Sequence, residues 1–128
     1  MNSSTDKLAA QFKALADPVR LRIVALCGIA ECSVSELTQV LGLSQPRASQ
    51  HLKQLIAAEV LERFRDGHFV YHRVSAGGRD FQLRRQLLAL LPDDAPEFAR
   101  DVEKLRKLRA QDGHGFSADE GEDRLLHK

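Results

Sequence analysis

The sequence of 128 residues lacks tryptophan and has few other aromatic side chains, which make up 5% of the chain. A core must therefore be built mainly from leucine, isoleucine, valine and alanine. No stretch approaches the ~20 apolar residues that a membrane-spanning helix needs, and residues 1–12 lack the basic start and apolar run of a signal peptide. Two cysteines do not make a disulfide framework. We therefore expect a cytoplasmic protein without membrane contact.

Motifs that carry catalysis are also missing. The chain has no nucleophile–base pattern, no glycine-rich phosphate loop and no metal-ligand motif, so we expect neither an enzyme nor a bound cofactor. The composition is that of an ordinary globular domain with one core, at 43% hydrophobic and 29% charged residues. Residues 111–128 hold five acidic and two basic side chains, which leaves a net charge of +4 on residues 1–110. This surplus permits nucleic-acid binding but does not require it.

Helical periodicity predicts four helices, which begin near Ser4, at Asp17, at Ser33 and at Ser44. Ser33 and Glu36 have capping-box spacing, because each side chain can bond the free backbone N–H of the other residue. Gly42 is a typical stop at the end of the third helix. Two short helices joined by the tight turn at residues 41–44 are typical of a helix-turn-helix.

A β-hairpin is predicted directly after the fourth helix. Residues 60–65 and 68–74 are rich in β-forming side chains and flank Asp66 and Gly67. Two residues of this type between such runs favour a type I′ turn with positive φ at both positions. A hairpin after a helix-turn-helix is a wing, so the sequence predicts a mainly α, winged helix-turn-helix fold.

The sequence returns to a helical pattern at residues 81–91. The leucines of this segment form an apolar surface wider than one small domain can bury, so we expect it to join the first helix in a homodimer interface. The predicted interface residues are Leu8, Phe12, Leu83, Leu87, Leu90 and Leu91. The alternative is a helix buried wholly within its own monomer.

The last helix is predicted after a polar break at residues 92–96. Its inward residues are Phe98, Val102, Leu105 and Leu108, and its basic residues Lys104, Arg106, Lys107 and Arg109 are predicted to point mostly outward as a solvated face. Polar, glycine-rich residues without periodicity follow. We therefore divide the chain into a winged helix-turn-helix and dimerisation domain at 1–92, a C-terminal helix at 93–110 and a disordered tail at 111–128.

A family resemblance is carried by the segments FKALADPVRLRIVALC, CSVSELTQVLGLSQPRASQHLKQL and VLERFRDGHFVYHRV. In this order and spacing they closely resemble the ArsR/SmtB family of bacterial repressors, over roughly Leu8 to Leu91. The resemblance implies a homodimer that binds double-stranded operator DNA and leaves it when an inducer binds. It does not identify the inducer.

The DNA-reading residues are predicted on the polar side of the fourth helix and at the wing. Exposed side chains near the N-terminus of a recognition helix reach base edges in the major groove, where Gln50 suits adenine and Arg47 suits guanine or phosphate. The residues expected to hold phosphates are Ser44, Gln45, Ser49 and Lys53. Arg65 and His68 flank the wing turn, near the adjacent minor groove. His51 suits packing as well as contact.

Relatives in this family often sense metals, but both familiar ligand sets are missing here. The arsenic-type motif has two cysteines where this chain has Ser33 and Ser35, with Cys32 one residue earlier. The dimer-helix zinc site needs Asp, His and Glu at positions that hold Ala76, Gly78, Ala89 and Pro92. His68 and His72 lie about 13 Å apart along a strand, too far to share one ion. His114 and His127 fall in the tail, so we expect no metal site.

Cys27 and Cys32 bracket the break at Gly28 and are the remaining candidates for a switch. They are either inert core thiols or a pair that forms a reversible disulfide, persulfide or arsenite adduct and shifts the helix-turn-helix. Two other functions stay open at this point. One is a metal(loid)-responsive repressor with a non-standard site, and the other is a winged-helix dimer that acts only through protein partners.

Overall fold

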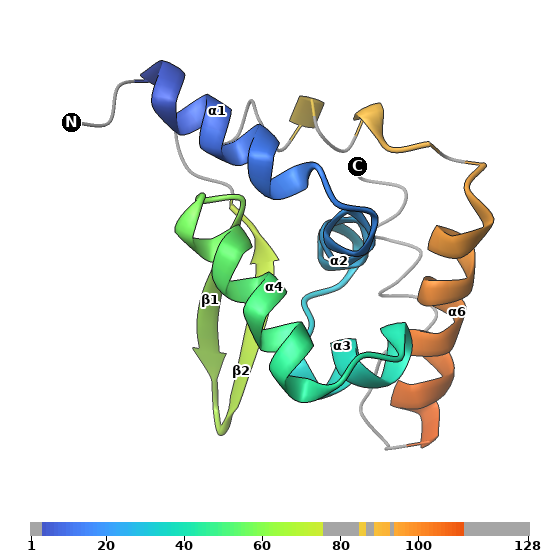
Figure 1. Cartoon of the computed structure of the whole chain (residues 1–128). Coiled ribbons are helices and arrows are strands. Elements are labelled where there is room, and N and C mark those ends of the chain that lie inside the picture. Colours follow the sequence, from blue (N-terminus) through green and yellow to red (C-terminus); the bar gives the residue numbers. More distant parts are fainter. Residues whose placement is uncertain (1–3, 76–84, 87–88, 93, 112–128) are drawn as a thin grey trace.

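The computed structural model describes residues 4–75, 85–86, 89–92 and 94–111. Its elements are α1 (Ser4–Leu15), α2 (Pro18–Ile29), α3 (Val34–Leu41), α4 (Gln45–Ala57), β1 (Leu61–Asp66), β2 (Phe69–Val74) and α6 (Pro96–Gln111). α2 lies at the centre, and the other helices and the hairpin are arranged around it (Figure 1). The predicted mainly α, winged helix-turn-helix architecture is confirmed.

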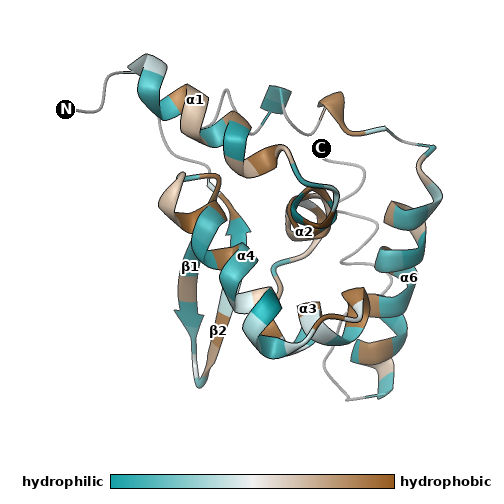
Figure 2. Cartoon of the chain, viewed as in Figure 1, coloured by the Kyte–Doolittle hydropathy of each residue, from teal (hydrophilic) through white to brown (hydrophobic). Residues whose placement is uncertain are grey.

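The core is aliphatic, as the shortage of aromatic residues predicts. Ile23 and Val24 of α2 are fully buried, and Leu37 of α3, Leu55 of α4 and Leu105 of α6 are buried with them. Figure 2 shows α2 as a largely hydrophobic helix enclosed by elements with hydrophilic outer faces. The helix-turn-helix and α6 therefore share one core.

The predicted capping residues begin the helices. The carboxylate Oδ1 of Asp17 accepts hydrogen bonds from the backbone N–H groups of Arg20 and Val19, at 3.0 and 2.8 Å. The bond from Arg20 has the largest effect, and together with the bond from Val19 it favours the charged carboxylate and lowers the pKa of Asp17. At α3 the capping box is complete, with the Glu36 N–H bonded to Ser33 Oγ at 3.2 Å and the Ser33 N–H bonded to Glu36 Oε1 at 3.0 Å.

The predicted hairpin is present, but the predicted position of its turn is wrong by one residue. Asp66 belongs to β1 and pairs with Phe69, so Gly67 and His68 form the turn. Within the described residues, Gly67 has a positive φ of 65° and His68 does not. Glycine at the first central position is typical of a type II′ turn. Gly67 takes the first position of the turn because glycine, which has no Cβ, adopts a positive φ without a steric clash.

The wing is attached to the helices through Cys32 and His72. Their backbones form an isolated antiparallel bridge, with N···O distances of 3.1 and 2.8 Å. The His72 ring adds a third bond, because its Nδ1–H donates to the same Cys32 carbonyl oxygen at 2.9 Å. Burial lowers the pKa of His72, which is 2% exposed, so the ring is neutral at pH 7. Cys32 precedes the cap of α3, and the bridge therefore ties β2 to the start of the helix-turn-helix.

Two ion pairs hold α6 in place, one to α2 and one to α3 of the helix-turn-helix. Arg22 of α2 forms a bidentate pair with the buried Asp101, at 2.9 and 2.7 Å. Arg109 bonds the Glu36 carboxylate at 2.7 and 3.1 Å and also donates to the Glu31 carbonyl oxygen at 2.6 Å. The predicted outward position of Arg109 is therefore wrong. Arg109 instead bonds the Glu36 carboxylate at the cap of α3, a contact between distant parts of the chain that periodicity alone does not reveal.

The Glu36–Arg109 pair makes a stability prediction. Replacing Glu36 by Gln removes the carboxylate that pairs with a guanidinium of 13% side-chain exposure, and breaking such a buried pair costs about 3 kcal/mol. Urea unfolding followed by circular dichroism measures this loss. The matched control is Glu103→Gln, since the Glu103–Arg106 pair is 52% and 40% exposed and such pairs contribute less than about 1 kcal/mol. Equal losses in both variants would contradict this role for Arg109.

The same pair predicts how stability depends on pH. Burial raises the pKa of Glu36, but the bonds and charge of Arg109 and the bonds of Ser33 outweigh it, so the pKa lies below the ordinary value of 4.5. A lowered pKa means that the stabilisation is present above the ordinary value and is lost as the pH falls through the lower folded value. Glu36→Gln should remove this acid-dependent loss, while Glu103→Gln should keep it.

Candidate nucleic-acid interface

The turn between α3 and α4 fixes the direction of the recognition helix. Gly42 ends α3 in the left-handed region, with φ 69° and ψ 36°, and its N–H bonds the Thr38 carbonyl oxygen. The Leu43 N–H bonds the same oxygen at 3.1 Å. Ser44 then caps α4, and its Oγ accepts from the Arg47 N–H at 3.3 Å. Ser44 therefore has a capping role besides its predicted contact with phosphate.

α4 presents one apolar and one polar face. Ala48, Leu52 and Leu55 are buried against the core. The predicted DNA-reading residues of this helix and its cap are all exposed, namely Ser44, Gln45, Arg47, Ser49, Gln50 and Lys53. The predicted orientation of α4 is therefore confirmed, and the contact of these residues with DNA remains a prediction.

His51 lies at the border between the two faces. It is half-buried, and its charge helps to lower the pKa of Asp17, although less than the backbone bonds from Arg20 and Val19 do. The ring therefore lies near the start of α2. Its Nδ1 is buried without a hydrogen-bond partner among the described residues. This environment favours packing over DNA contact for His51.

The wing carries a basic row that includes one residue the sequence analysis missed. Arg65 and His68 are exposed, as predicted, with Arg65 near the end of β1 and His68 in the turn. Arg63 is also exposed. Because side chains alternate along a strand, Arg63 and Arg65 share one face of β1. The alternation of side chains along this strand is the sequence signal that could have identified Arg63 together with Arg65.

The other face of the wing is held by aromatic rings and ion pairs. Phe64 and Tyr71 pair across the strands with ring centroids 5.9 Å apart. Arg73 lies over the Phe64 ring at 4.3 Å and forms an ion pair with Glu62 at 3.0 Å. A second ion pair joins Arg73 to Glu31, at 3.8 Å. These contacts stiffen the hairpin and leave the arginine row on its opposite face.

Part of the predicted dimer surface lies within the described residues. Leu8 and Phe12 of α1 are 43% and 58% exposed, and Leu90 is 77% exposed. Leu91 is half-buried. Leu83 and Leu87 lie outside the described residues. Exposed apolar side chains of this size on α1 are the pattern expected of an interface that a single protomer leaves uncovered.

The two cysteines come together in the core. Both are free and buried, at 4% exposure for Cys27 and 0% for Cys32. A hydrogen bond with the Cys27 thiol, together with burial, raises the pKa of Cys32 well above its ordinary value. The Cys32 thiol also donates to the Ala30 carbonyl oxygen at 3.1 Å. A buried, protonated thiol is a poor nucleophile, and burial shields both thiols from reagents in solvent.

Among the described residues, no three His, Cys, Asp or Glu side chains gather in a way that could hold a metal ion. His72 is buried in its bond with Cys32, while His68 is exposed in the turn. His114 and His127 lie outside the described part of the chain. Of the helices that the structure describes, none combines the length and apolar character needed to cross a bilayer.

Comparison with known proteins places this geometry in a family. Residues 15–63 match a family model described as a helix-turn-helix domain. The arsenic resistance transcriptional regulator ArsR1 of Pseudomonas putida is 47% identical over 64 residues, which cover 49% of this chain and 50% of that protein. The chain thus spans about half the length of this relative.

Two solved structures share the fold. The transcriptional repressor BigR from Xylella fastidiosa is 31% identical, with a TM-score of 0.58 over 68% of this chain and 85% of that chain. The homodimeric winged helix-turn-helix DNA-binding domain of a possible ArsR-family regulator from Mycobacterium bovis is 27% identical, with a TM-score of 0.58 over 70% and 87%. The chain belongs to the ArsR/SmtB family of winged helix-turn-helix transcriptional regulators.

Proposed function

We propose that this protein is a cytoplasmic, homodimeric repressor that binds double-stranded operator DNA and leaves it when an inducer binds. The observation that carries the proposal is the exposed polar face of α4 beside a basic wing. α4 packs against β1, and the N-terminal end of α4 and the tip of the hairpin point toward the same side of the molecule (Figure 1). One duplex can therefore meet both elements.

The roles of the residues follow from their places on these elements. Arg47 and Gln50 lie in the first turns of α4, where a recognition helix reaches base edges. Gln50 suits a bidentate contact with adenine, and Arg47 suits guanine or a phosphate. Phosphate contacts from Ser44, Gln45, Ser49 and Lys53 would set the register of the helix in the groove. On the wing, we expect Arg63, Arg65 and His68 to contact the flanking minor groove.

A dimer supplies the second half-site. The exposed Leu8 and Phe12 give α1 an apolar surface, and the related domain from Mycobacterium bovis is homodimeric. An isologous interface repeats the α4 and wing pair about a two-fold axis. Two recognition helices then meet successive major grooves, about one helical turn of DNA apart.

The first prediction concerns the recognition helix. On the best duplex selected from a random library, Gln50→Ala should cost about 1–3 kcal/mol and relax sequence preference. Lys53→Ala should weaken binding to all sequences and reduce the salt slope by about one. Fluorescence anisotropy at several salt concentrations measures both effects. Lys104→Ala, an exposed lysine on α6, is the matched control and should bind as wild type.

Two results would contradict this assignment. Unchanged affinity in both α4 variants would exclude α4 as the reading helix. If the wild type shows no salt-sensitive DNA binding, the result favours the alternative of a winged-helix dimer that acts only through protein partners.

The second prediction concerns assembly. Phe12→Glu should convert the dimer to a folded monomer, because Phe12 is 58% exposed in the single protomer and contributes little to its core. Sedimentation equilibrium gives the mass and circular dichroism the helix content. Phe69→Glu is the matched control, since Phe69 is 51% exposed on the wing, and it should remain dimeric. A folded dimer after the Phe12 change would refute the interface on α1.

The third prediction concerns the inducer. If the chain carries its own redox switch, the switch is the Cys27–Cys32 pair, because both thiols are buried in one core and Cys32 lies at the wing bridge and directly before the cap of α3. With a polysulfide, the two thiols give up two electrons and two protons, an S–S bond forms, and one sulfane sulfur leaves as hydrogen sulfide. The strained loop would then tilt α3 and loosen the fit to DNA.

The thiol test compares wild type with Cys27→Ser and Cys32→Ser under oxidant, polysulfide and arsenite. Operator affinity and free-thiol content are read together, and circular dichroism checks that each variant is folded. We expect the wild type to lose affinity as its thiols are consumed, while both variants keep their affinity. A wild type that ignores all three reagents shows that the cysteines are structural.

A further inference from the structure

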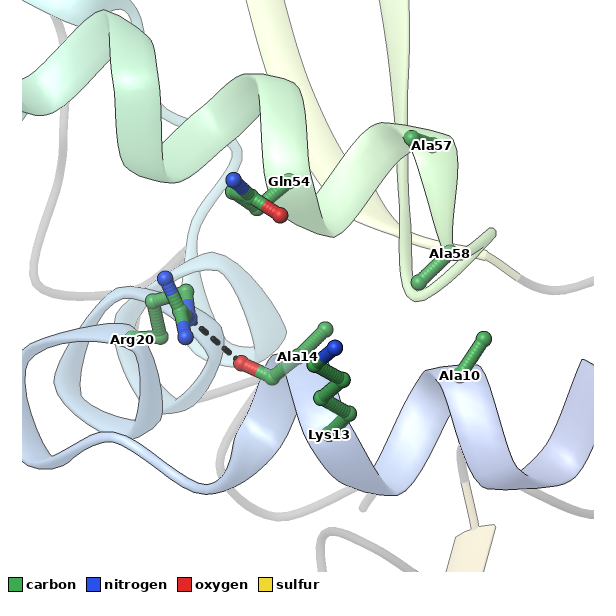
Figure 3. A pocket seen from close by; sticks show the side chains of 7 residues that line it. All are labelled: Ala10, Lys13, Ala14, Arg20, Gln54, Ala57 and Ala58. Carbon is green, nitrogen blue, oxygen red and sulfur yellow. Dashed lines mark hydrogen bonds between the residues drawn. The ribbon is translucent and has the colours of Figure 1, made fainter.

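A groove runs between α1 and α4, and no residue that lines it has a role in the proposed repressor function. Its volume is about 370 Å³, within the range of small-molecule sites. The lining residues are Ala10, Lys13, Ala14, Arg20, Gln54, Ala57 and Ala58. Figure 3 shows Gln54 on α4 facing the side chains of α1 and of the start of α2 across this space. Four alanines leave the space open, since no long apolar side chain fills it.

Two of the three polar side chains that line the groove, Lys13 and Arg20, carry a positive charge. The Arg20 Nε–H donates to the Ala14 carbonyl oxygen at 2.6 Å, which holds the guanidinium at the groove. Neither Arg20 nor Lys13 forms an ion pair with a carboxylate among the described residues. Asp17 lies near Arg20, but its Oδ1 accepts the backbone N–H groups at the start of α2. The groove thus offers two cations and one amide beside apolar methyl groups.

This combination fits an amphiphilic anion. A guanidinium offers a planar fork of donors that matches a carboxylate, sulfonate or phosphate. The Lys13 ammonium adds a second positive charge, and the Gln54 amide can donate or accept. The alanine methyl groups suit a flat or aliphatic body attached to the anionic group. A partner that offers only charge would leave these methyl groups without contact.

The groove and the proposed dimer surface use different sides of α1. At about 100° per residue, Ala10 lies about 160° around α1 from both Leu8 and Phe12. Ala14 is about 160° and about 120° from Phe12 and Leu8, and Lys13 is about 100° and about 140° from them. The groove side of α1 therefore faces away from the dimer surface, with Lys13 nearest to it. The groove also lies along the C-terminal half of α4, and Ala57 is about 15 Å along the helix from Arg47. This separation favours a small molecule over a DNA phosphate as the occupant.

We propose that this groove binds a small organic anion with an apolar body, and that its occupancy lowers operator affinity. The second half rests on the proposed repressor function. An occupant contacts α1, which carries the dimer surface, and Gln54, which lies one turn beyond Gln50 on the reading helix. It therefore changes the position of α4 relative to the dimer axis. The fit of the dimer to the major grooves of DNA depends on the spacing of the two reading helices. Linkage requires that operator DNA weakens anion binding by the same factor.

The experiment uses sodium benzoate as the anionic probe and benzamide as its uncharged match, in a titration of the full chain followed by two-dimensional amide NMR. We expect saturable shifts at Ala10, Ala14, Gln54 and Ala57 with benzoate and much weaker ones with benzamide. Lys13→Gln should weaken benzoate binding about threefold to fivefold, the size of one exposed ion pair. Ala57→Leu should fill the groove and abolish the shifts, while Lys104→Gln should bind as wild type.

Further arms separate the sources of the anion. Inorganic phosphate tests whether charge alone is sufficient, and tighter binding of phosphate than of benzoate contradicts the apolar body. A short non-operator duplex that shifts the same amides, with a salt slope reduced by about one in Lys13→Gln, shows a DNA phosphate site and overturns the proposal. No saturable shifts, or equal shifts with benzamide, overturn it as well.

The operator arm distinguishes this proposal from the repressor function. Anisotropy of labelled operator is measured in the wild type and in Ala57→Leu, with and without saturating benzoate. We expect benzoate to lower wild-type affinity and to leave the variant unchanged. Operator binding that ignores saturating benzoate overturns the coupling. Failure to bind DNA even without benzoate contradicts the repressor function, while the NMR result still decides the groove.

Discussion

The position of the wing depends on the bridge between Cys32 and His72. Three hydrogen bonds meet there, two between the backbones and one from the imidazole, at 2.8 to 3.1 Å. Both residues are buried, where an unpaired polar group costs about 1–3 kcal/mol. β2 therefore cannot slide without losing them together. Since Ser33 caps α3 directly after Cys32, the wing and the helix-turn-helix keep one relative position.

α6 extends the same support to the opposite side of the helix-turn-helix. Leu105 fills the core, and Arg109 holds the Glu36 carboxylate that completes the cap of α3. The buried Cys32 lies near this ion pair. The Cys27 bond and burial have the largest effects on its pKa, and the charges of Glu36 and Arg109 have smaller ones. A chemical change at the thiols, at α6 or at the wing bridge therefore reaches the same cap.

Local chemistry was sufficient to predict the first four helices and which side chains of α4 are exposed. The Asp17 cap, the Ser33–Glu36 box and the Gly42 stop depend on near neighbours in sequence, and the structure confirms them. The turn at Gly67 was displaced by one residue because strand pairing, not turn preference alone, sets the register. Arg109 and the α1–α4 groove could not be predicted, since each depends on residues far apart in the chain. Periodicity describes one helix at a time and cannot show which cation meets which carboxylate.

The most direct test of the account is a hydroxyl-radical footprint of the full chain on its selected operator. A dimer that reads DNA through α4 and the wing should protect two backbone patches about 10 base pairs apart, with further protection in the flanking minor grooves. Arg63→Ala combined with Arg65→Ala should remove only the flanking protection, and Gln50→Ala should weaken the central pattern. A single continuous patch, or a footprint that neither variant alters, would contradict the placement of α4 and the wing on DNA.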